Sequence, residues 1–161
     1  MPELQWKAGF EVGVARMDDT HREFVEHYNA LARAAPEDFL ARLDDFAAHT
    51  EAHFAQENRW MEAVGFPACH RAEHERVLAV IGDIRQRVAN GDRFLGRRLV
   101  EELPAWFANH TEGMDAALAF HLQSIGFDVE RGGFVARDSD ACAPQGGCAC
   151  ASLAVAPETA G

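Results

Sequence analysis

Apolar residues recur every three or four positions along most of the chain, which is the period of an amphipathic α-helix. Four segments show this pattern, and none of them shows the alternation of period two that is typical of a strand. The pattern therefore predicts an all-α protein. The four predicted helices cover about residues 18–35, 36–65, 67–90 and 92–125.

Residues that favour helix ends separate these segments. Proline is tolerated in a first helical turn, glycine and asparagine often follow the last turn, and aspartate before the first turn accepts a backbone hydrogen bond. Pro104 lies inside the fourth helix, where it removes one backbone hydrogen bond and predicts a kink about two turns before His110. The predicted end markers are Asp18 or Asp19, Pro36, Gly65, Pro67, Asn90, Gly91 and Asp92.

Helices joined by short loops pack antiparallel to their neighbours, so we predict an up-down-up-down antiparallel four-helix bundle. We assign residues 1–127 to this domain, and we expect the first 17 residues to form an extended arm across the bundle. From residue 128 the apolar rhythm fades into a segment containing Gly, Ala and Cys. We expect residues 128–161 to be a flexible, disordered tail.

Composition and charge narrow the class of partner. The chain has 161 residues, 48% of them hydrophobic, and a formal net charge of −11. This predicts a folded core, while the negative charge argues against binding to nucleic acid or to an anionic membrane. No basic stretch followed by an apolar run opens the sequence, and no apolar segment reaches the ~18 residues of a membrane span. We therefore expect a cytoplasmic location.

The four cysteines do not form the evenly spread framework of a disulfide-stapled domain. Cys69 stands alone and is expected to be a packing residue, while Cys142, Cys148 and Cys150 crowd into the tail. Those three could bind a metal or respond to oxidation. Because no fourth ligand is evident, we expect this part of the chain to have no chemical role.

Two pairs of polar residues lie on the apolar stripes of the second and third helices. Residues four apart on a helix project in nearly the same direction, so each pair can reach one object. One pair is His53 and Glu57, and the other is His70 and His74. The short turn between these helices makes them antiparallel neighbours, so we expect the two pairs to face each other.

The first and fourth helices add three further residues of the same kind. His21 and His110 are each in phase with the apolar positions of their helix. Asp115 follows His110 by five residues, which is about 140° around an α-helix. We therefore expect the Asp115 carboxylate to approach from the flank and to bridge.

Together these residues supply five imidazoles and two carboxylates from all four helices. A single buried histidine is usually a core residue, but packing alone does not explain seven such side chains on four core stripes. One zinc ion needs only four ligands, so we expect two metal ions. Imidazoles bind iron, copper, zinc or nickel, and two redox-active irons fit this mostly neutral set best.

The order H…HxxxE…HxxxH…HxxxxD resembles the hemerythrin family, in particular its single-domain bacterial type, bacteriohemerythrin. The resemblance covers about residues 4–125 and includes the flanking stretches "VGVARMDDTH", "RWMEAVGFP" and "WFANH". It implies reversible dioxygen binding at a non-haem di-iron centre with an oxo or hydroxo bridge and iron that cycles between Fe2+ and Fe3+. The metal ligands that it implies are His21, His53, Glu57, His70, His74, His110 and Asp115.

The resemblance also implies a role for each ligand. One iron would be held by His70, His74 and His110, and the other by His21 and His53. The carboxylates of Glu57 and Asp115 would bridge both irons. The second iron then has one ligand fewer than the first. Its open position is where dioxygen would bind.

Residues beside the ligands complete the implied cofactor site. Apolar side chains would keep water and protons from the bound dioxygen, and the candidates are Phe24, Phe54, Trp106 and Phe107. Core packing explains these four equally well. Thr111 departs from the family pattern, because a bulky aliphatic residue usually follows this histidine. We expect the Thr111 hydroxyl to promote autoxidation by donating a proton or admitting water.

The main alternative is a di-iron enzyme on the same scaffold, such as a peroxidase, an oxidase or a nitric-oxide-handling protein. Ferritin-like enzymes use Glu-x-x-His pairs, and no histidine here has a glutamate three residues before it. We therefore predict a non-enzymatic oxygen carrier, store or sensor. A sensor would need an unidentified redox or signalling partner, since this chain shows no fused signalling module.

Three histidines remain outside the predicted site. His49 lies one turn before His53 on the same stripe, where it can contact that ligand. His27 points about 240° away from His21 and is expected to lie in solvent. His121 receives no role.

Overall fold

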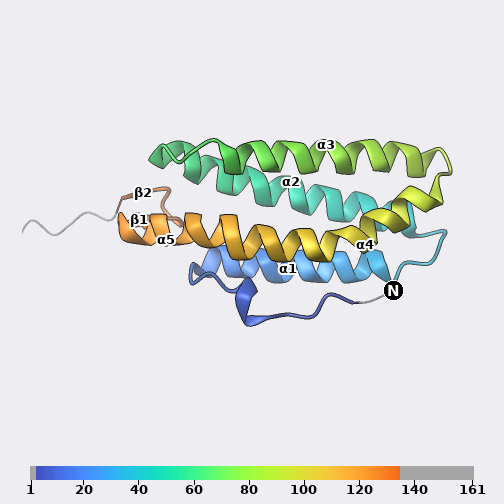
Figure 1. The fold of residues 1–161 in the computed structure, drawn as a ribbon, viewed down its shortest axis with the longest axis horizontal. Coiled ribbons are helices and arrows are strands. Elements are labelled where there is room, and N and C mark those ends of the chain that lie inside the picture. Colours follow the sequence, from blue (N-terminus) through green and yellow to red (C-terminus); the bar gives the residue numbers. More distant parts are fainter. Residues whose placement is uncertain (1–2, 135–161) are drawn as a thin grey trace, which may run out of the picture.

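In a computed structural model, four long helices each run antiparallel to the next one along the chain (Figure 1). The structure describes residues 3–134. Each helix follows a segment of the predicted periodicity. The elements, in chain order, are η1 (Ala8–Phe10), α1 (Ala15–Ala32), α2 (Phe39–Val64), α3 (Cys69–Ala89), α4 (Arg93–Asn109), η2 (His110–Asp115), α5 (Ala116–Ser124), β1 (Phe127–Asp128) and β2 (Gly133–Phe134).

Neighbouring helices along the chain are also neighbours in space. Helix α1 packs on α2, α2 on α3 and α3 on α4, while contacts between α4 and α1 close the bundle. In Figure 1, α4, η2 and α5 follow one another as a single continuous rod. The predicted up-down-up-down four-helix bundle is confirmed.

Most predicted helix ends lie where the structure has them. Gly65 follows α2 in the left-handed conformation with φ of 65°, which a residue without Cβ adopts most easily. The Asp92 carboxylate accepts a hydrogen bond of 3.1 Å from the Leu95 N–H and so caps α4. Pro36 was expected in the first turn of the second helix. It lies instead in the turn ahead of α2.

The prediction that Asp18 or Asp19 caps the first helix is wrong. Helix α1 begins three residues before Asp18, at Ala15, and its N-cap residue Val14 has no side-chain cap. The buried Asp18 carboxylate instead accepts hydrogen bonds from the N–H groups of Val12 and Gly13, at 2.7 and 3.3 Å. Asp18 therefore fastens the preceding loop to the helix, a role that helix-end statistics do not distinguish from capping.

The helix that contains Pro104 continues through that residue to Asn109. Its departure from α-helical geometry comes later, in the π-helical segment η2 (His110–Asp115). A π-helix forms hydrogen bonds between residues five apart, and it occurs mostly as a single turn within an α-helix. This segment lies within the predicted metal site.

Two apolar clusters fill the bundle, one toward each end. The larger contains Phe24, Phe46, Phe54, Ile81, Leu103 and Phe107 among others, and the smaller contains Val14, Met17, Trp60, Met61, Leu118, Ala119, Leu122 and Phe127. On α1, His21 lies between the residues of the two clusters, and on the fourth rod the same is true of His110 and Asp115. The polar residues of the predicted site therefore form a layer between two dry cores.

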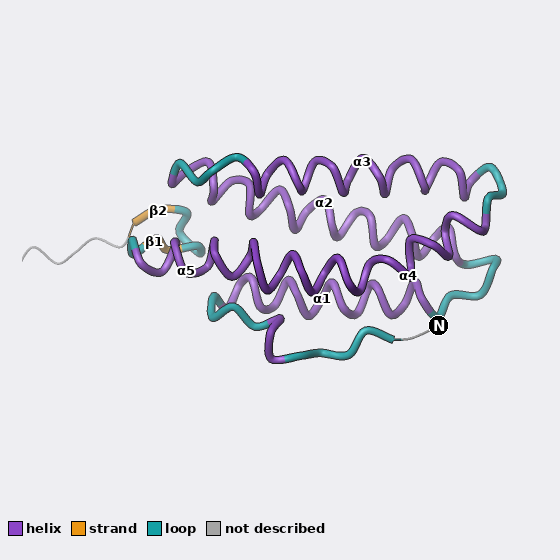
Figure 2. The backbone as a smooth tube through the Cα atoms, viewed as in Figure 1, coloured by secondary structure: helices purple, strands orange, loops and turns teal. Residues whose placement is uncertain are grey.

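The expected N-terminal arm lies along the outside of the bundle, beside α1 (Figure 2). Asn29 on α1 fastens its beginning, since its side chain accepts from the Leu4 N–H at 2.8 Å and donates to the Leu4 carbonyl at 3.0 Å. The short helix η1 then turns Phe10 into the core, where the side chain is fully buried. The arm is therefore part of the folded domain.

A small hairpin follows the last helix. Strands β1 and β2 pair antiparallel, with Phe127 opposite Phe134 and Asp128 opposite Gly133. Residues 128–134 were expected to belong to a disordered tail without strands, but they contain part of β1 and all of β2. Cys142, Cys148 and Cys150 lie outside the described residues.

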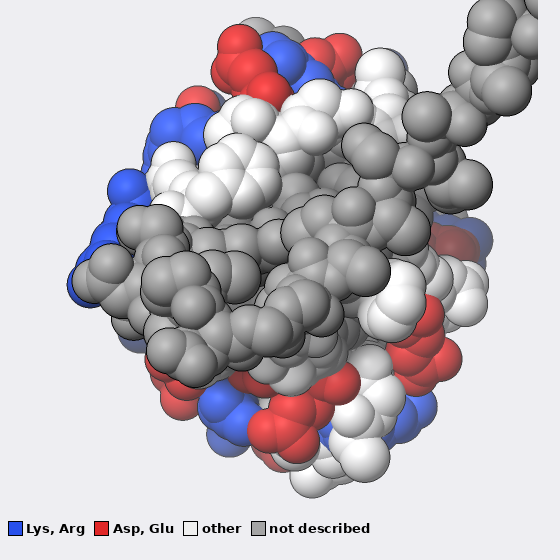
Figure 3. Space-filling model, turned by 90° about the vertical axis from the view of Figure 1, so that its left-hand side faces the viewer, with Lys and Arg blue, Asp and Glu red and all other residues white. Residues whose placement is uncertain are grey.

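Charged side chains of both signs surround the end of the bundle that carries this hairpin (Figure 3). Lys and Arg cluster at one edge of this view, and Asp and Glu gather at the top and bottom. Among residues 3–134, no helix is long and apolar enough to cross a membrane. The absence of nucleic-acid and membrane partners and the cytoplasmic location remain predictions.

Candidate metal centre

The structure brings all seven predicted ligands together inside the bundle. None of them exposes more than 4% of its surface. Two overlapping groups of donor atoms form, and within each group the atoms lie within 4.8 Å of one another. One group is Glu57, His70, His74, His110 and Asp115, and the other is His21, His53, Glu57 and Asp115.

The π-helical segment η2 aligns His110 with Asp115. In an α-helix these residues would point about 140° apart, and this was the basis for expecting a carboxylate that approaches from the flank. A π-helical turn joins residues five apart, so Asp115 returns to the face of His110. Their Nε2 and Oδ1 atoms lie 3.1 Å apart. The flank approach is therefore wrong, because the backbone changes its period at this point.

The two oxygens of Glu57 face different histidines. Its Oε1 atom is 2.9 Å from His53 Nε2. Its Oε2 atom faces the other side and lies 3.3 Å from His74 Nε2 and 3.6 Å from His70 Nε2. The carboxylate therefore spans the two groups of donors.

Asp115 divides its oxygens in the same way. Its Oδ2 atom is 3.0 Å from His21 Nε2. Its Oδ1 atom lies 3.0 Å from His70 Nε2 and 3.1 Å from His110 Nε2. Two carboxylates that each have one oxygen on either side are the arrangement expected of ligands that bridge a pair of cations.

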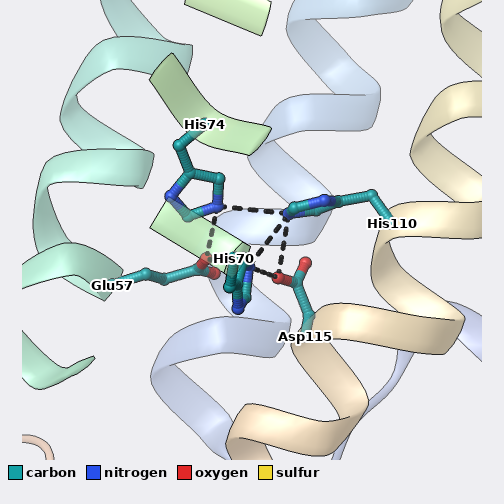
Figure 4. Close-up of side chains that lie close together, drawn as sticks. All are labelled: Glu57, His70, His74, His110 and Asp115. Carbon is teal, nitrogen blue, oxygen red and sulfur yellow. Dashed lines mark hydrogen bonds and ion pairs between the residues drawn. The ribbon is translucent and has the colours of Figure 1, made fainter. Parts of the chain in front are cut away.

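Three imidazoles converge on one point (Figure 4). His110 Nε2 is 3.2 Å from His70 Nε2 and also 3.2 Å from His74 Nε2. The nearest carboxylate oxygens, Glu57 Oε2 and Asp115 Oδ1, are buried and have no hydrogen-bond partner. Lone pairs that face one another in a dry interior need a proton or a cation between them. The residues present therefore fit a metal ion on this side.

Two polar groups that the sequence analysis missed orient ligand imidazoles. His21 Nδ1–H donates a hydrogen bond of 2.8 Å to the Phe10 carbonyl of the arm. His74 Nδ1–H donates one of 2.8 Å to Asn58 Oδ1. Each bond leaves Nε2 free to face the centre, as outer partners of metal-bound histidines do. Asn58 directly follows Glu57 and could have been suggested by that proximity, whereas no side-chain pattern reveals a backbone carbonyl.

The predicted aromatic residues lie against the ligand rings or one ring away from them. Phe54 stacks on His74 with ring centroids 4.0 Å apart, and Trp106 stacks on His110 at 4.7 Å. Phe107 meets His21 edge-on at 5.7 Å and stacks on Phe24 at 4.1 Å, while Thr111 is buried with no hydrogen-bond partner for its hydroxyl. Their proposed roles toward dioxygen remain predictions.

The electrostatics of the centre keep both carboxylates ionised. Burial and the Asp115 charge push the pKa of Glu57 upward, but the His53 and His74 imidazoles outweigh them and lower this pKa to about 2. Burial also acts to raise the pKa of Asp115, yet the surrounding imidazoles, His110 and His21 foremost, hold it well below its usual value. Two fixed negative charges in a dry interior favour cations.

Two of the imidazoles respond to those charges in the opposite direction. Burial acts to lower the pKa of His21 and of His110, but the Asp115 carboxylate outweighs it, and both pKa values are raised from 6.5. Burial lowers the pKa of His74. In the metal-free protein, the two carboxylates therefore favour the protonated forms of His21 and His110.

The metal-free protein should lose stability as the pH rises above 6.5. A histidine whose pKa is raised by folding contributes its full stabilisation below the unfolded value of 6.5 and loses it as the pH rises through the folded value. We expect the urea midpoint of the metal-free protein to fall across this range. With metal bound, the ligating Nε2 atoms hold no proton and the fall should be absent. A metal-free midpoint that stays level or rises would contradict this assignment.

The remaining histidines differ in their environment. His49 lies beside His53, as expected, with ring centroids 5.9 Å apart. Burial, with the neighbouring His53 and His27, lowers the pKa of His49 to about 4. His27 was expected in solvent, but it is half-buried because its ring stacks on His49 at 4.8 Å. Cys69 was expected to pack, but it is exposed at the start of α3.

Comparisons with known proteins identify similar chains. The model of the hemerythrin HHE cation binding domain matches residues 12–119. A bacteriohemerythrin of Ralstonia nicotianae is 49% identical over 131 residues, which cover 80% of this chain and 96% of that protein. Those of Stenotrophomonas maltophilia and Pseudomonas paraeruginosa are 29% and 28% identical, each over 85% of this chain and 95% of the relative. No solved structure matches the chain.

Proposed function

The chain belongs to the hemerythrin family, and on that premise we propose that it binds dioxygen reversibly at a non-haem di-iron centre. The buried cluster of histidines and carboxylates suits such a centre. The observation that carries the proposal is the division of Glu57 and Asp115, each with one oxygen toward either group of imidazoles. A carrier, a store and a sensor of oxygen would all use this arrangement.

The two groups of donors differ in number, and this difference supports one open position. Five residues surround one metal position and four surround the other, with the two carboxylates common to both. We assign His70, His74 and His110 to the first iron and His21 and His53 to the second. Dioxygen would then bind at the second iron, and an oxo or hydroxo bridge would complete both.

The iron ions would supply the electrons that dioxygen takes up on binding and returns on release. The protein holds the donors in place and limits water. The Phe10 carbonyl keeps His21 Nε2 directed at the centre, and aromatic rings cover the imidazoles on the larger-cluster side. Exclusion of water from such a site prevents proton-dependent side reactions. These features support reversible binding and not a catalytic cycle.

The test is to reduce the iron-loaded protein without air and cycle it between air and vacuum while its visible spectrum is recorded. The proposal expects two irons per chain and a charge-transfer band that develops in air and disappears under vacuum. Irreversible oxidation with turnover of an added substrate would favour the enzymatic alternative. Failure to bind iron would overturn both functions.

Replacing Thr111 with isoleucine should slow autoxidation of the oxygenated protein. The Thr111 hydroxyl is buried one residue after His110 and has no hydrogen-bond partner among residues 3–134, so it is free to donate a proton or to hold a water molecule. The decay rate of the charge-transfer band in air measures the effect. Thr111→Val removes only the hydroxyl and separates its effect from that of side-chain bulk. Unchanged decay in both variants would show that Thr111 does not affect autoxidation.

A further inference from the structure

Three side chains of the types that can bind metals lie outside the centre, where α1 and α2 pack together. Glu23 and His27 are one helical turn apart on α1, and His49 lies on α2. Glu23 Oε2 is 3.7 Å from His49 Nδ1. The rings of His27 and His49 stack with centroids 4.8 Å apart. The proposed function assigns no role to these three residues.

The exposure of the side chains decreases from this group toward the centre. Glu23 exposes 60% of its side chain and His49 exposes 10%, while His53 exposes 2%. His49 precedes His53 by one turn of α2, and their ring centroids are 5.9 Å apart. The side chains therefore form a row that leads from solvent to a proposed iron ligand.

Unpaired nitrogen atoms occur along this row. His49 Nε2 and His53 Nδ1 are both buried, and neither makes a hydrogen bond of standard geometry within residues 3–134, although the Thr20 backbone interacts with the His49 ring. Native proteins leave few buried polar atoms unpaired, so such atoms indicate a ligand, a water or another function. Imidazole nitrogens and a carboxylate are ligands that divalent iron accepts. The row therefore has the chemistry of a path for a divalent cation.

From this geometry we infer that Glu23, His27 and His49 form an uptake relay that captures divalent iron at the surface and passes it to His53. The inference rests on the proposed function, because it concerns how the same centre acquires its metal. The imidazole rings of His27 and His49 are stacked with an angle of 24° between their planes, so their lone pairs do not converge on one atom. This suits brief capture, whereas a storage site would surround the ion.

A relay solves a physical difficulty of the buried centre. Its seven ligands expose 4% or less of their surface, so an ion must shed its water to reach them. Removing the hydration of an ion in a single step is costly in an apolar interior. In a relay, the ion would exchange its water first for the Glu23 carboxylate and then for the imidazoles of His27 and His49. The cost of dehydration is thereby divided into smaller steps.

The test measures the rate at which the metal-free protein takes up ferrous iron without air. Samples are quenched with a ferrous chelator at intervals, and the iron retained by the protein is counted. His49→Gln should slow uptake about tenfold, the low end of the gain that charged clefts give to association rates. His27→Gln and Glu23→Gln change more exposed residues and should slow it by a smaller factor. All three should reach the iron content of the wild type.

Two variants serve as matched controls. His121→Gln removes an imidazole from α5, where His121 contacts Phe66 and not the row. Glu51→Gln removes an exposed carboxylate from α2 two residues beyond His49, about 200° around the helix. Both should take up iron as fast as the wild type.

The outcomes separate the relay from the proposed function. Equal uptake rates in the wild type and all three relay variants would overturn the relay alone. The relay would also be overturned if the control variants slowed iron uptake as much as His49→Gln does. General charge or helix stability would then explain the effect. Wild-type protein that takes up no iron would overturn both proposals. Normal relay behaviour in a protein that does not bind dioxygen reversibly would overturn only the proposed function.

Discussion

Replacing Asp115 with asparagine should abolish stable binding of the iron pair. Asp115 supplies one oxygen to each group of imidazoles and one of the two buried negative charges of the centre. The amide keeps the shape of the side chain but removes that charge, and its nitrogen cannot act as an acceptor. Loss of a bridging ligand should lower iron affinity by more than the roughly 10–100-fold cost of altering outer partners.

The measurement is the iron content after anaerobic loading and desalting, together with the visible band in air. We expect less than the wild-type content and no reversible band. Asp19→Asn is the matched control, since Asp19 is exposed on the same bundle, where it pairs with Arg22 at 3.2 Å. Circular dichroism shows whether the variant remains helical. A folded Asp115→Asn protein that retains the full iron content would rule out bridging by this residue.

Replacing Phe10 with alanine should destabilise the metal-free protein by about 3–5 kcal/mol, the usual cost of removing a buried aromatic side chain. Phe10 is fully buried although it belongs to the arm. Its ring contacts Phe107 with centroids 4.8 Å apart, and Phe107 in turn contacts His21. The loss therefore creates a cavity at the junction of the arm, the fourth helix and the centre.

Urea unfolding of the metal-free protein measures this loss without a contribution from bound metal. Trp6→Ala is the control, because Trp6 contacts Phe10 but is 36% exposed, and its removal should cost much less. The Phe10 variant should also bind iron more weakly, since a loosened arm directs His21 less well. Equal destabilisation by the two variants would show that the arm does not depend on burial of Phe10.

The periodicity of the sequence was sufficient to predict the bundle and to place six of the seven buried residues of the centre on core stripes, Asp115 being the exception. This succeeded because His53 and Glu57, like His70 and His74, occur at the α-helical spacing that places both side chains on one stripe. Where the backbone keeps the α-helical period, the spacing of two residues in the sequence gives the angle between their side chains. Residues of the apolar cores follow the same rule.

What could not be predicted depends on the backbone. The predicted orientation of Asp115 was wrong because residues 110–115 form a π-helical turn, to which the α-helical period does not apply. The hydrogen bond from His21 to the Phe10 carbonyl depends on where the arm turns, and any residue supplies such a carbonyl. Asp18 satisfies the rule for an N-cap but bonds to the loop before the helix. In each case the side chain was correctly noted and the backbone decided its role.

The π-helical turn also sets the orientation of everything that follows it. Compared with an α-helix, it inserts one additional residue and so rotates the downstream helix by about 100°. With that rotation, Leu118 and Leu122 enter the smaller apolar cluster while Phe120 remains 74% exposed. The same insertion that turns Asp115 toward the imidazoles of the centre thus brings α5 into phase with its own core. One additional residue in the helix therefore sets both the orientation of Asp115 and the packing of α5.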